Sequence, residues 1–215
     1  MMKRVKFKTL EILESVLPKY CRGLTVDLGC GYGKYRSLIE KYADKYIGID
    51  NQTSTVQFND QYRSKPDISA DVCQTTLKNE SIDTVICTEV IEHVPDPFLL
   101  MAEISRILKS GGYLILSSGW LAPYHQEPKD YWRFSPDGYS VLCEKNGLKI
   151  IDCINKGNFW VMVCHIFFRG FDLKHHKLFL KFIRVIYIFY SVAAFFDRRS
   201  QTNDPIGHLI VAKKL

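Results

Sequence analysis

Glycine falls at every second position within the stretch TVDLGCGYGKY, which runs from Thr25 to Tyr35. An apolar run precedes Gly29, Gly31 and Gly33, so the chain leaves a predicted strand and gives up side chains there. Glycine permits tight turns at positive φ, and it lets the backbone approach a ligand closely because it has no Cβ. The helix predicted next offers free N–H groups in its first turn. The stretch therefore predicts a turn that makes room for a cofactor at the end of a strand.

Four acidic residues lie at or just after the ends of successive predicted strands: Asp27, Asp50, Asp71 and Glu89. Ligands of open α/β sheets bind beyond the carboxyl ends of the strands, so we expect these side chains to line one rim. Carboxylates there suit a cationic ligand with hydroxyl and amino groups, and they would repel a diphosphate. Any one of these acids could instead cap a helix or turn, but together they favour a cofactor site. The same interpretation predicts that lysine and arginine side chains do not neutralise them.

The glycine spacing differs from that of the dinucleotide-binding fingerprint. The fingerprint, Gly-x-Gly-x-x-Gly, seats a pyrophosphate on a helix N-terminus, whereas this chain has Gly-x-Gly-x-Gly. Asp50 does lie roughly 20 residues further on, where an acid can bind two ribose hydroxyls. A nicotinamide-dependent oxidoreductase is therefore an alternative, and the missing third glycine of the fingerprint argues against it.

Glu89, Glu92 and His93 come close together in the segment TEVIEHVPDP, which follows the predicted fourth strand. Two acids and a histidine suggest acid–base or metal chemistry. Their spacing matches neither His-x-x-x-His nor His-Glu-x-x-His, so no metal site is predicted. The alternative is that the segment caps and packs the next helix, with Pro95 and Pro97 fixing its approach.

A long polar and aromatic loop, GWLAPYHQEPKDYWRFSPDGY, follows the predicted fifth strand. It leaves the carboxyl end of the sheet, where a substrate would lie, and its aromatic density argues against disorder. We expect a substrate site formed by five of its residues: Tyr124, Asp130, Tyr131, Trp132 and Arg133. His125 could act as a base, oriented by Glu127 or Asp130. In the alternative interpretation the aromatic side chains pack the loop on the sheet, and Asp130 and Arg133 form a local ion pair.

Apolar strands alternate with amphipathic helices along the chain. Strands are predicted at residues 24–28, 46–50, 67–72, 82–88, 112–118, 148–154 and 208–212. Helices are predicted at residues 6–17, 34–42, 98–109 and 136–146, with Gly111 and Gly112 ending the third and Gly147 ending the fourth. Most strands are apolar throughout, which indicates a parallel sheet covered by helices on both faces. We expect one domain over residues 1–215.

The composition is that of an ordinary globular protein, with 47% hydrophobic and 24% charged residues among 215. The net charge of +6 could serve nucleic acid, an anionic membrane or phosphate, and it decides nothing until the charges are located. The seven cysteines are an odd number, and no two of them have Cys-x-x-Cys spacing. They indicate core residues in a reducing cytosol, so a cytoplasmic location is predicted. The N-terminus lacks the continuous apolar core of a secretory signal.

The motifs VDLGCGYG, YIGID, ADV and IDTVICTEVIEHVPDP resemble, in this order, those of class I S-adenosylmethionine-dependent methyltransferases of the type-11-like family. The resemblance runs from about Leu24 to Ser118. It implies an α/β fold with a Rossmann-like seven-stranded sheet, mostly parallel with an antiparallel last strand, and helices on both faces. It also implies S-adenosylmethionine as the cofactor, whose sulfonium and ammonium groups suit the acidic rim. The cofactor-binding residues that it implies are Asp27, Gly29, Cys30, Gly31, Gly33, Asp50, Asp71, Val72 and Glu89.

Within this set the resemblance assigns a part of the cofactor to each position. Asp27 and the glycines border the methionine part, and Asp50 binds the ribose. Asp71 and Val72 contact adenine, and Glu89 lies near the sulfonium and methyl group. His93 is expected in the wall of the pocket.

These features predict methyl transfer to a hydroxyl of a small-molecule or glycan-like acceptor, which the protein positions in line with the methyl group. The loop pattern P-x-H-x-x-P-x-D-Y-W-R-F-S-P resembles a methyltransferase subgroup associated with sugars and cell-surface polysaccharides. His125 is the expected general base, in preference to His93, because a histidine titrates near neutral pH. A non-catalytic methyltransferase-like scaffold is a further alternative. Nucleic acid is not expected as a partner, because the basic residues do not form an aromatic-interleaved groove.

Residues 159–200 differ in composition from the rest of the chain. The run from Val185 to Phe196 is apolar, and it is too short for a bilayer, which needs about 20 residues. A basic stripe at approximate helical spacing accompanies it: Lys177, Lys181, Arg184 and Arg198. Residues 172–199 could contact the inner face of a membrane as a peripheral helix, cover the active site as a lid, or be buried in a dimer.

Overall fold

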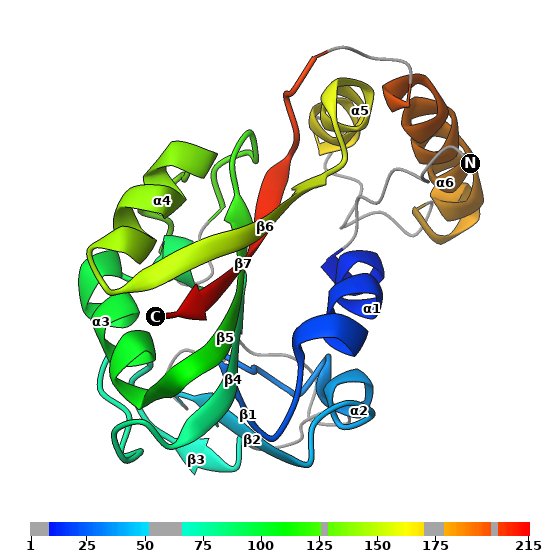
Figure 1. Cartoon of the computed structure of the whole chain (residues 1–215). Helices are drawn as coiled ribbons and strands as arrows, with labels where there is room; N and C mark the ends of the chain where they lie inside the picture. The colour runs from blue at the N-terminus through cyan, green and yellow to red at the C-terminus, as the bar shows by residue number, and fades with distance from the viewer. Residues whose placement is uncertain (1–8, 52–65, 126–128, 170–178, 199–201) are drawn as a thin grey trace.

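A single sheet lies at the centre of the molecule (Figure 1). The structure, a computed structural model, describes residues 9–51, 66–125, 129–169, 179–198 and 202–215. Within these residues the sheet has seven strands in the order β3-β2-β1-β4-β5-β7-β6. The strands are β1 (Leu24–Leu28), β2 (Lys45–Asp50), β3 (Ile68–Ser69), β4 (Ile82–Thr88), β5 (Leu108–Gly119), β6 (Leu148–Lys156) and β7 (Gly207–Lys214).

The pairing of the strands is parallel over most of the sheet. β1 pairs in parallel with β2 and β4, β2 with β3, and β4 with β5. β7 runs antiparallel to both β5 and β6. The predicted α/β sheet, mostly parallel with an antiparallel last strand, is confirmed.

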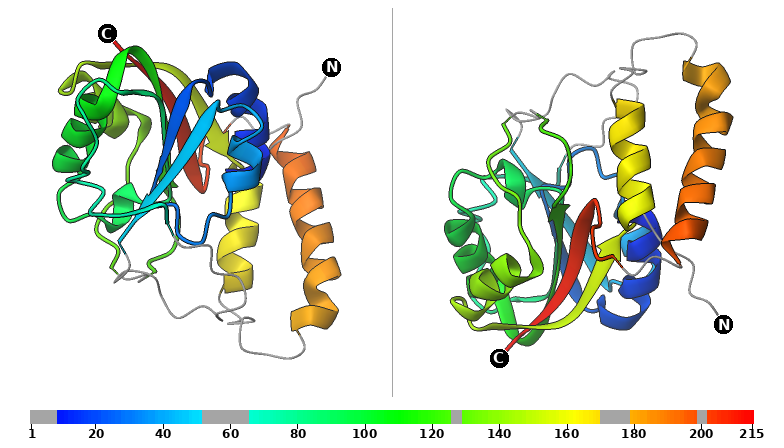
Figure 2. Two further views of the ribbon diagram at one scale, coloured as in Figure 1. Left: turned by 90° about the horizontal axis from the view of Figure 1, so that it is seen from below. Right: turned by 90° about the horizontal axis from the view of Figure 1, so that it is seen from above.

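Helices cover both faces of the sheet, as predicted (Figure 2). They are α1 (Thr9–Tyr20) and α2 (Arg36–Ile39) on one face, and α3 (Pro97–Ile107) and α4 (Pro136–Glu144) on the other. Successive side chains of a strand point to opposite faces, so a strand covered on both sides is apolar throughout. In β4, Val85 and Cys87 belong to the core with α3 and α4, whereas Ile86 belongs to the core with α1 and α2.

The position of β1 decides where a ligand can bind. β1 lies between β2 and β4. The chain leaves β1 toward β2 and β3 on one side and later returns to β4 and β5 on the other. The segments that follow β1 and β4 therefore emerge side by side at the carboxyl edge of the sheet, at the switch point where open α/β sheets bind ligands.

The predicted end of the third helix is wrong. α3 ends at Ile107, and β5 begins directly at Leu108. Gly111 and Gly112 lie inside β5, where its pairing with β4 shifts register. Gly111 has a φ of +78°, and a Cβ at Gly112 would lie 2.9 Å from a backbone oxygen, so this irregularity in the strand needs both glycines.

The first two helices also differ from their predicted bounds. Residues 6–8 of the predicted lead-in helix lie outside the described residues, and α1 continues past Pro18 to Tyr20. α2 covers only Arg36–Ile39 of the predicted residues 34–42.

The region predicted as a helical insertion contains α5 (Phe159–Arg169) and α6 (Phe179–Asp197), which lie side by side (Figures 1 and 2). Val161 of α5 packs against Ala193 and Ala194 of α6, whose small side chains let the helices approach. Asp197 at the end of α6 accepts hydrogen bonds from backbone N–H groups at the start of α5. Lys177 of the predicted basic stripe lies outside the described residues. In the described part of the chain, every helix is too short or too polar to cross a membrane.

Candidate functional site

The turn after β1 holds its three glycines in the left-handed region, at φ +71° for Gly29, +55° for Gly31 and +73° for Gly33. Gly29 donates its N–H to the carbonyl oxygen of Ile49, at the end of β2, over 2.8 Å. A Cβ at Gly29 would lie 2.3 Å from Cγ2 of Val90, so no side chain fits there. A Cβ at Gly31 would meet no atom of the described residues within 4 Å. The turn therefore packs against the segment after β4 and borders open space at Gly31.

Two of the predicted cofactor-binding acids lie beside this turn. Asp50 accepts a hydrogen bond from the N–H of Gly31 through Oδ2, at 2.6 Å. Asp27 is only 2% exposed, and its Oδ2 accepts a hydrogen bond from the Tyr46 hydroxyl at 3.0 Å. Burial raises the pKa of Asp27 to about 7; the Tyr46 hydroxyl opposes this rise, and the charge of Asp50 adds to it. Asp27 is thus a buried acid, which the prediction of an open acidic rim did not anticipate.

Cys30, Asp71 and Val72 complete the predicted cofactor residues near β1 to β3. The Cys30 side chain packs over β2, where a Cβ at Gly48 would lie 2.9 Å from its Sγ, and burial raises the pKa of the thiol to about 12. Asp71 is exposed, and its Oδ1 accepts the N–H of Cys73 at 2.8 Å. Val72 is half-buried against the core. Asp71 therefore caps a local turn, which the sequence allowed as the alternative to binding a cofactor.

Glu89 follows β4 directly, and it has a φ of +57°, which is uncommon for a residue with a Cβ. Its N–H donates to the carbonyl oxygen of Ser117 at 2.9 Å, and its Oε1 accepts the Ser117 hydroxyl and the Lys156 ammonium at 2.6 Å each. Burial acts to raise the pKa of Glu89, but Lys156 and these hydrogen bonds outweigh it, so the pKa lies below its usual value. The prediction that no lysine or arginine neutralises the acids is wrong for Glu89. Lys156, a nearly buried residue at the end of β6, was missed from the sequence.

Glu92 is fully buried on the short 3-10 helix η2 (Ile91–His93), and the sequence assigned it no role. Its Oε2 has no hydrogen-bond partner among the described residues, and its Oε1 lies 3.5 Å from the N–H of Gly119. Burial raises the pKa of Glu92 to about 8, and the nearby charge of Glu89 adds to this rise. Burial therefore favours the protonated form of Glu92 when nothing cationic is bound beside it.

The loop after β5 is held by an ion pair between Asp130 and Arg133. The Arg133 guanidinium contacts both carboxylate oxygens, and it holds the pKa of Asp130 at about 2. Arg133 also donates to the carbonyl oxygens of Ala122 and Pro123, at 3.2 and 3.3 Å. Asp130 Oδ2 accepts the backbone N–H of His125 at 2.9 Å and lies 3.4 Å from its Nδ1. The ion pair expected under the packing interpretation is present, and it positions His125.

The aromatic residues of the loop differ in their exposure. Tyr124 is 66% exposed, Tyr131 44% and Trp132 40%. The Trp132 ring stacks on Phe134 with centroids 6.3 Å apart, and its Nε1 donates to the carbonyl oxygen of Val94 at 3.0 Å. Trp132 therefore docks the loop on the segment after β4, whereas Tyr124 presents most of its ring to solvent.

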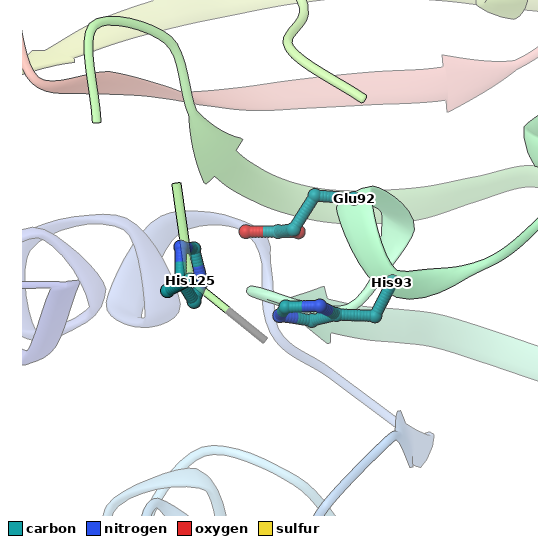
Figure 3. Close-up of side chains that lie close together, drawn as sticks. All are labelled: Glu92, His93 and His125. Atoms are coloured by element: carbon teal, nitrogen blue, oxygen red, sulfur yellow. The ribbon is translucent and has the colours of Figure 1, made fainter. Parts of the chain in front are cut away.

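The docked loop brings His125 next to Glu92 and His93 (Figure 3). Their ligand-type atoms, a carboxylate oxygen and one nitrogen of each ring, all lie within 4.8 Å of one another. The two imidazole rings meet edge to face with centroids 5.1 Å apart. Nδ1 of His93 contacts the carbonyl oxygen of Lys129. Glu127, the other residue expected to orient His125, lies outside the described residues.

Sequence comparisons relate part of the chain to known methyltransferases. Residues 26–116 match a family model described as "Methyltransferase domain", a segment that contains the glycine turn, Glu89 and Glu92. A ubiquinone biosynthesis O-methyltransferase of Actinobacillus pleuropneumoniae is 28% identical over 103 residues, 43% of this chain and 44% of that protein. A protein of the same name from Coxiella burnetii is 26% identical over 176 residues, 68% of this chain and 75% of the relative.

A solved structure also matches nearly the whole chain. Phosphoethanolamine N-methyltransferase 2 of Haemonchus contortus, in complex with S-adenosyl-L-methionine, superposes with a TM-score of 0.61 at 17% identity. The match covers 95% of this chain and 51% of that one. At this identity the likeness shows the fold. The chain spans less than half of the length of the Actinobacillus relative, 44%.

Proposed function

Because residues 26–116 match a methyltransferase family model and the sheet has the order and pairing described above, we propose that the protein is a class I S-adenosylmethionine-dependent methyltransferase and that it transfers the methyl group of this cofactor to a hydroxyl of a small-molecule or glycan-like acceptor. The observation that carries the proposal is the open side of the glycine turn. A side chain at Gly31 would meet no atom of the described residues within 4 Å, and the Gly31 N–H holds the Asp50 carboxylate beside that space. The cluster of Glu92, His93 and His125 lies at the end of the neighbouring strand, where an acceptor would meet the cofactor.

S-adenosylmethionine supplies an electrophilic methyl group on a sulfonium when it is bound. In this proposal Asp50 accepts the ribose hydroxyls, because a carboxylate can accept several hydrogen bonds. Asp71 and Val72 contact adenine, and Gly31 lets the cofactor approach the backbone. Glu89 contributes a hydrogen-bond acceptor more than a net charge, since Lys156 already balances it.

His125 is the proposed general base. The acceptor oxygen forms its bond to the methyl carbon as the carbon–sulfur bond breaks, and the hydroxyl proton passes to His125. Nδ1 of His125 lies 3.2 Å from the carbonyl oxygen of Pro123 and faces Asp130, so the tautomer that donates through Nδ1 leaves Nε2 to take the proton. The Asp130–Arg133 pair holds the ring in this orientation and contributes to in-line positioning.

The names of the relatives and the exposed loop aromatics support a hydroxyl acceptor. The Actinobacillus and Coxiella proteins are named as O-methyltransferases. Tyr124, Tyr131 and Trp132 lie in the same loop segment as His125 and offer flat, partly exposed rings, which suit a sugar face or an aromatic ring. We propose that Arg133 and Asp130 complete this acceptor site through the loop that they hold.

Two measurements test the proposal. Calorimetric titration with S-adenosylhomocysteine and, separately, with a nicotinamide dinucleotide should show binding of the first alone; the reverse result would replace the proposal with an oxidoreductase. A screen with methyl-labelled cofactor against fractionated cell-envelope precursors should then give a labelled methyl ether, formed at a hydroxyl of the acceptor. Cofactor binding with no labelled product across hydroxyl, amine and carboxyl acceptors would favour a non-catalytic scaffold.

We also propose that residues 172–199 bring the protein to the inner face of a membrane from the cytoplasm. Ile188, Phe189, Val192 and Phe195 on α6 are each 44–61% exposed, and Arg198 beside them is exposed. An apolar helix face flanked by cations can lie in the interface of an anionic bilayer. Flotation of the full chain with anionic vesicles should show binding that Val192→Ser with Phe195→Ser removes. Unchanged flotation would refute a membrane role for this face, and dimerisation lost in the same variant would place the face in a protein contact.

A further inference from the structure

We propose that Glu92, His93 and His125 form a binding site for one divalent transition-metal ion of the zinc type, with an open position for the acceptor oxygen. The metal site itself stands on the geometry of the three side chains. The role of the open position rests on the proposed function.

The distances between the three side chains fit a single ion after a small adjustment. The three candidate ligand atoms lie within 4.8 Å of one another. Zinc binds histidine nitrogen and carboxylate oxygen at about 2.0–2.2 Å, which puts the ligand atoms of a tetrahedral site roughly 3.4 Å apart. A bound ion would therefore require the atoms to close by about 1 Å or slightly more, through small changes in the side-chain torsions of the three residues.

The buried carboxyl of Glu92 is an independent sign that something binds here. Glu92 is 0% exposed, and its Oε2 has no hydrogen-bond partner among the described residues. A buried polar atom without a partner is costly and calls for an explanation, such as a bound ion or water. Figure 3 shows the Glu92 carboxyl projecting toward His125 and lying over His93. The missing partner thus belongs in the space that the two imidazoles share.

Both imidazole rings are held by their Nδ1 atoms. His93 Nδ1 contacts the carbonyl oxygen of Lys129. His125 Nδ1 lies 3.2 Å from the carbonyl oxygen of Pro123 and 3.4 Å from Asp130 Oδ2. Histidine ligands of metals commonly donate one ring N–H to a carbonyl or carboxylate, which fixes the tautomer and leaves the other nitrogen for the ion. Both rings therefore carry the outer contacts of metal ligands.

The ligand types and the local charges favour a zinc-like ion. Two imidazoles and one carboxylate are the donors of catalytic zinc sites, which keep a further position open. Magnesium and calcium prefer oxygen donors. Of the carboxylates around the cluster, Glu89 is paired with Lys156 and Asp130 with Arg133. No ion pair is formed by Glu92 among the described residues, so Glu92 is the carboxyl that would lose its proton to balance the charge of a bound cation.

An ion at this site changes the role of His125. A hydroxyl oxygen that occupies the open position loses its proton to solvent more readily, as water does on zinc. The bound oxygen would form its bond to the methyl carbon as the carbon–sulfur bond of the cofactor breaks and S-adenosylhomocysteine leaves, and His125 would serve as a ligand through Nε2. The same residue thus acts as a free base without metal and as a ligand with it.

Cobalt(II) is the probe that tests the site, because its visible spectrum reports coordination without any methyl transfer. The chelator-treated full chain is titrated with Co²⁺, followed by displacement with Zn²⁺. We expect one equivalent of Co²⁺ with the strong visible bands of a four- or five-coordinate ion. His125→Ala and Glu92→Gln should each weaken Co²⁺ binding by roughly 100-fold. Losing a residue that only hydrogen-bonds a metal ligand already costs about 10–100-fold, so losing a ligand should cost at least the upper end of that range.

His165→Ala is the matched control, because His165 lies on α5 and contacts Tyr190 instead of the cluster. It should bind Co²⁺ as the unaltered chain does. Near-ultraviolet thiolate bands, or Co²⁺ binding that survives both His125→Ala and Glu92→Gln, would overturn the site. S-adenosylhomocysteine binding, measured on the same samples, separates the two claims. If the unaltered chain does not bind S-adenosylhomocysteine, the proposed function is refuted. If it binds S-adenosylhomocysteine but not Co²⁺, only the metal site is refuted.

Discussion

Replacing Gly31 by alanine should weaken S-adenosylhomocysteine binding while disturbing the fold only slightly. The new Cβ would meet no described atom of the protein within 4 Å, and it would enter the space proposed for the cofactor. A left-handed backbone costs alanine about 1–2 kcal/mol. Alanine also reduces the conformational entropy of the unfolded chain, which offsets about 0.4–1 kcal/mol of this cost. The free energy of unfolding should therefore fall by roughly 1 kcal/mol. The dissociation constant should rise at least ~10-fold, which corresponds to about 1.4 kcal/mol.

Gly147 provides the matched control for this substitution. It has a φ of +67°, its Cβ would also meet no atom of the described residues within 4 Å, and it lies in the turn between α4 and β6. Gly147→Ala should therefore lose the same stability and keep the affinity for the cofactor. Gly29→Ala should behave differently again, because its Cβ would lie 2.3 Å from Val90 and the turn itself would have to move.

Urea unfolding gives the free energy of unfolding of each variant, and calorimetry gives its dissociation constant for S-adenosylhomocysteine. The decisive comparison is between Gly31→Ala and Gly147→Ala, which should lose the same stability but differ in their affinity for S-adenosylhomocysteine. If Gly31→Ala binds S-adenosylhomocysteine as tightly as Gly147→Ala does, the open side of the turn is not the cofactor site.

Three further predictions concern side chains whose charge or position the structure explains. Asp130→Asn should remove about 2 kcal/mol of stability at pH 7, because the folded pKa of Asp130, about 2, lies below the unfolded value of ~3.9. This contribution is present above pH ~4 and vanishes as pH falls toward about 2. In urea unfolding, the difference in free energy between the variant and the unaltered chain should therefore be smaller at about pH 3 than at about pH 7, and a constant difference would contradict the ion pair. The pH dependence of stability has the opposite sign for Glu92, since its folded pKa of about 8 lies above the unfolded value of ~4.3. In the presence of a chelator, the free energy of unfolding measured in urea should fall as pH rises from about 4 to 8. Glu92→Gln should flatten that fall, and an unchanged slope in the variant would refute the prediction. Asp197→Ala should lower the free energy of unfolding by about 1–2 kcal/mol, because the Asp197 carboxylate accepts the N–H groups of Trp160 and Val161 at 2.6 and 3.2 Å. Hydrogen exchange at these two amides should become faster in the variant, and unchanged exchange there would rule out the cap.

Local signals in the sequence were enough for the sheet and for the glycine turn. Continuous apolar runs report strands covered on both faces, and the glycines at positions 29, 31 and 33 report a backbone that only glycine adopts easily. These properties depend on neighbours in the chain, so they survive without knowledge of the fold. The same reasoning failed at Gly111 and Gly112, because a glycine that ends a helix and one that bends a strand look alike in sequence.

The sequence by itself therefore determined the fold class, the order of the elements and the edge of the sheet at which chemistry can occur. Only the tertiary structure decided which side chains meet there. Lys156 reaches Glu89 across 67 positions, and His125 reaches Glu92 only because the ion pair of Asp130 folds its loop back over the segment after β4. Contacts of this kind depend on strand order and loop docking, which place distant residues together without leaving any periodic pattern in the chain.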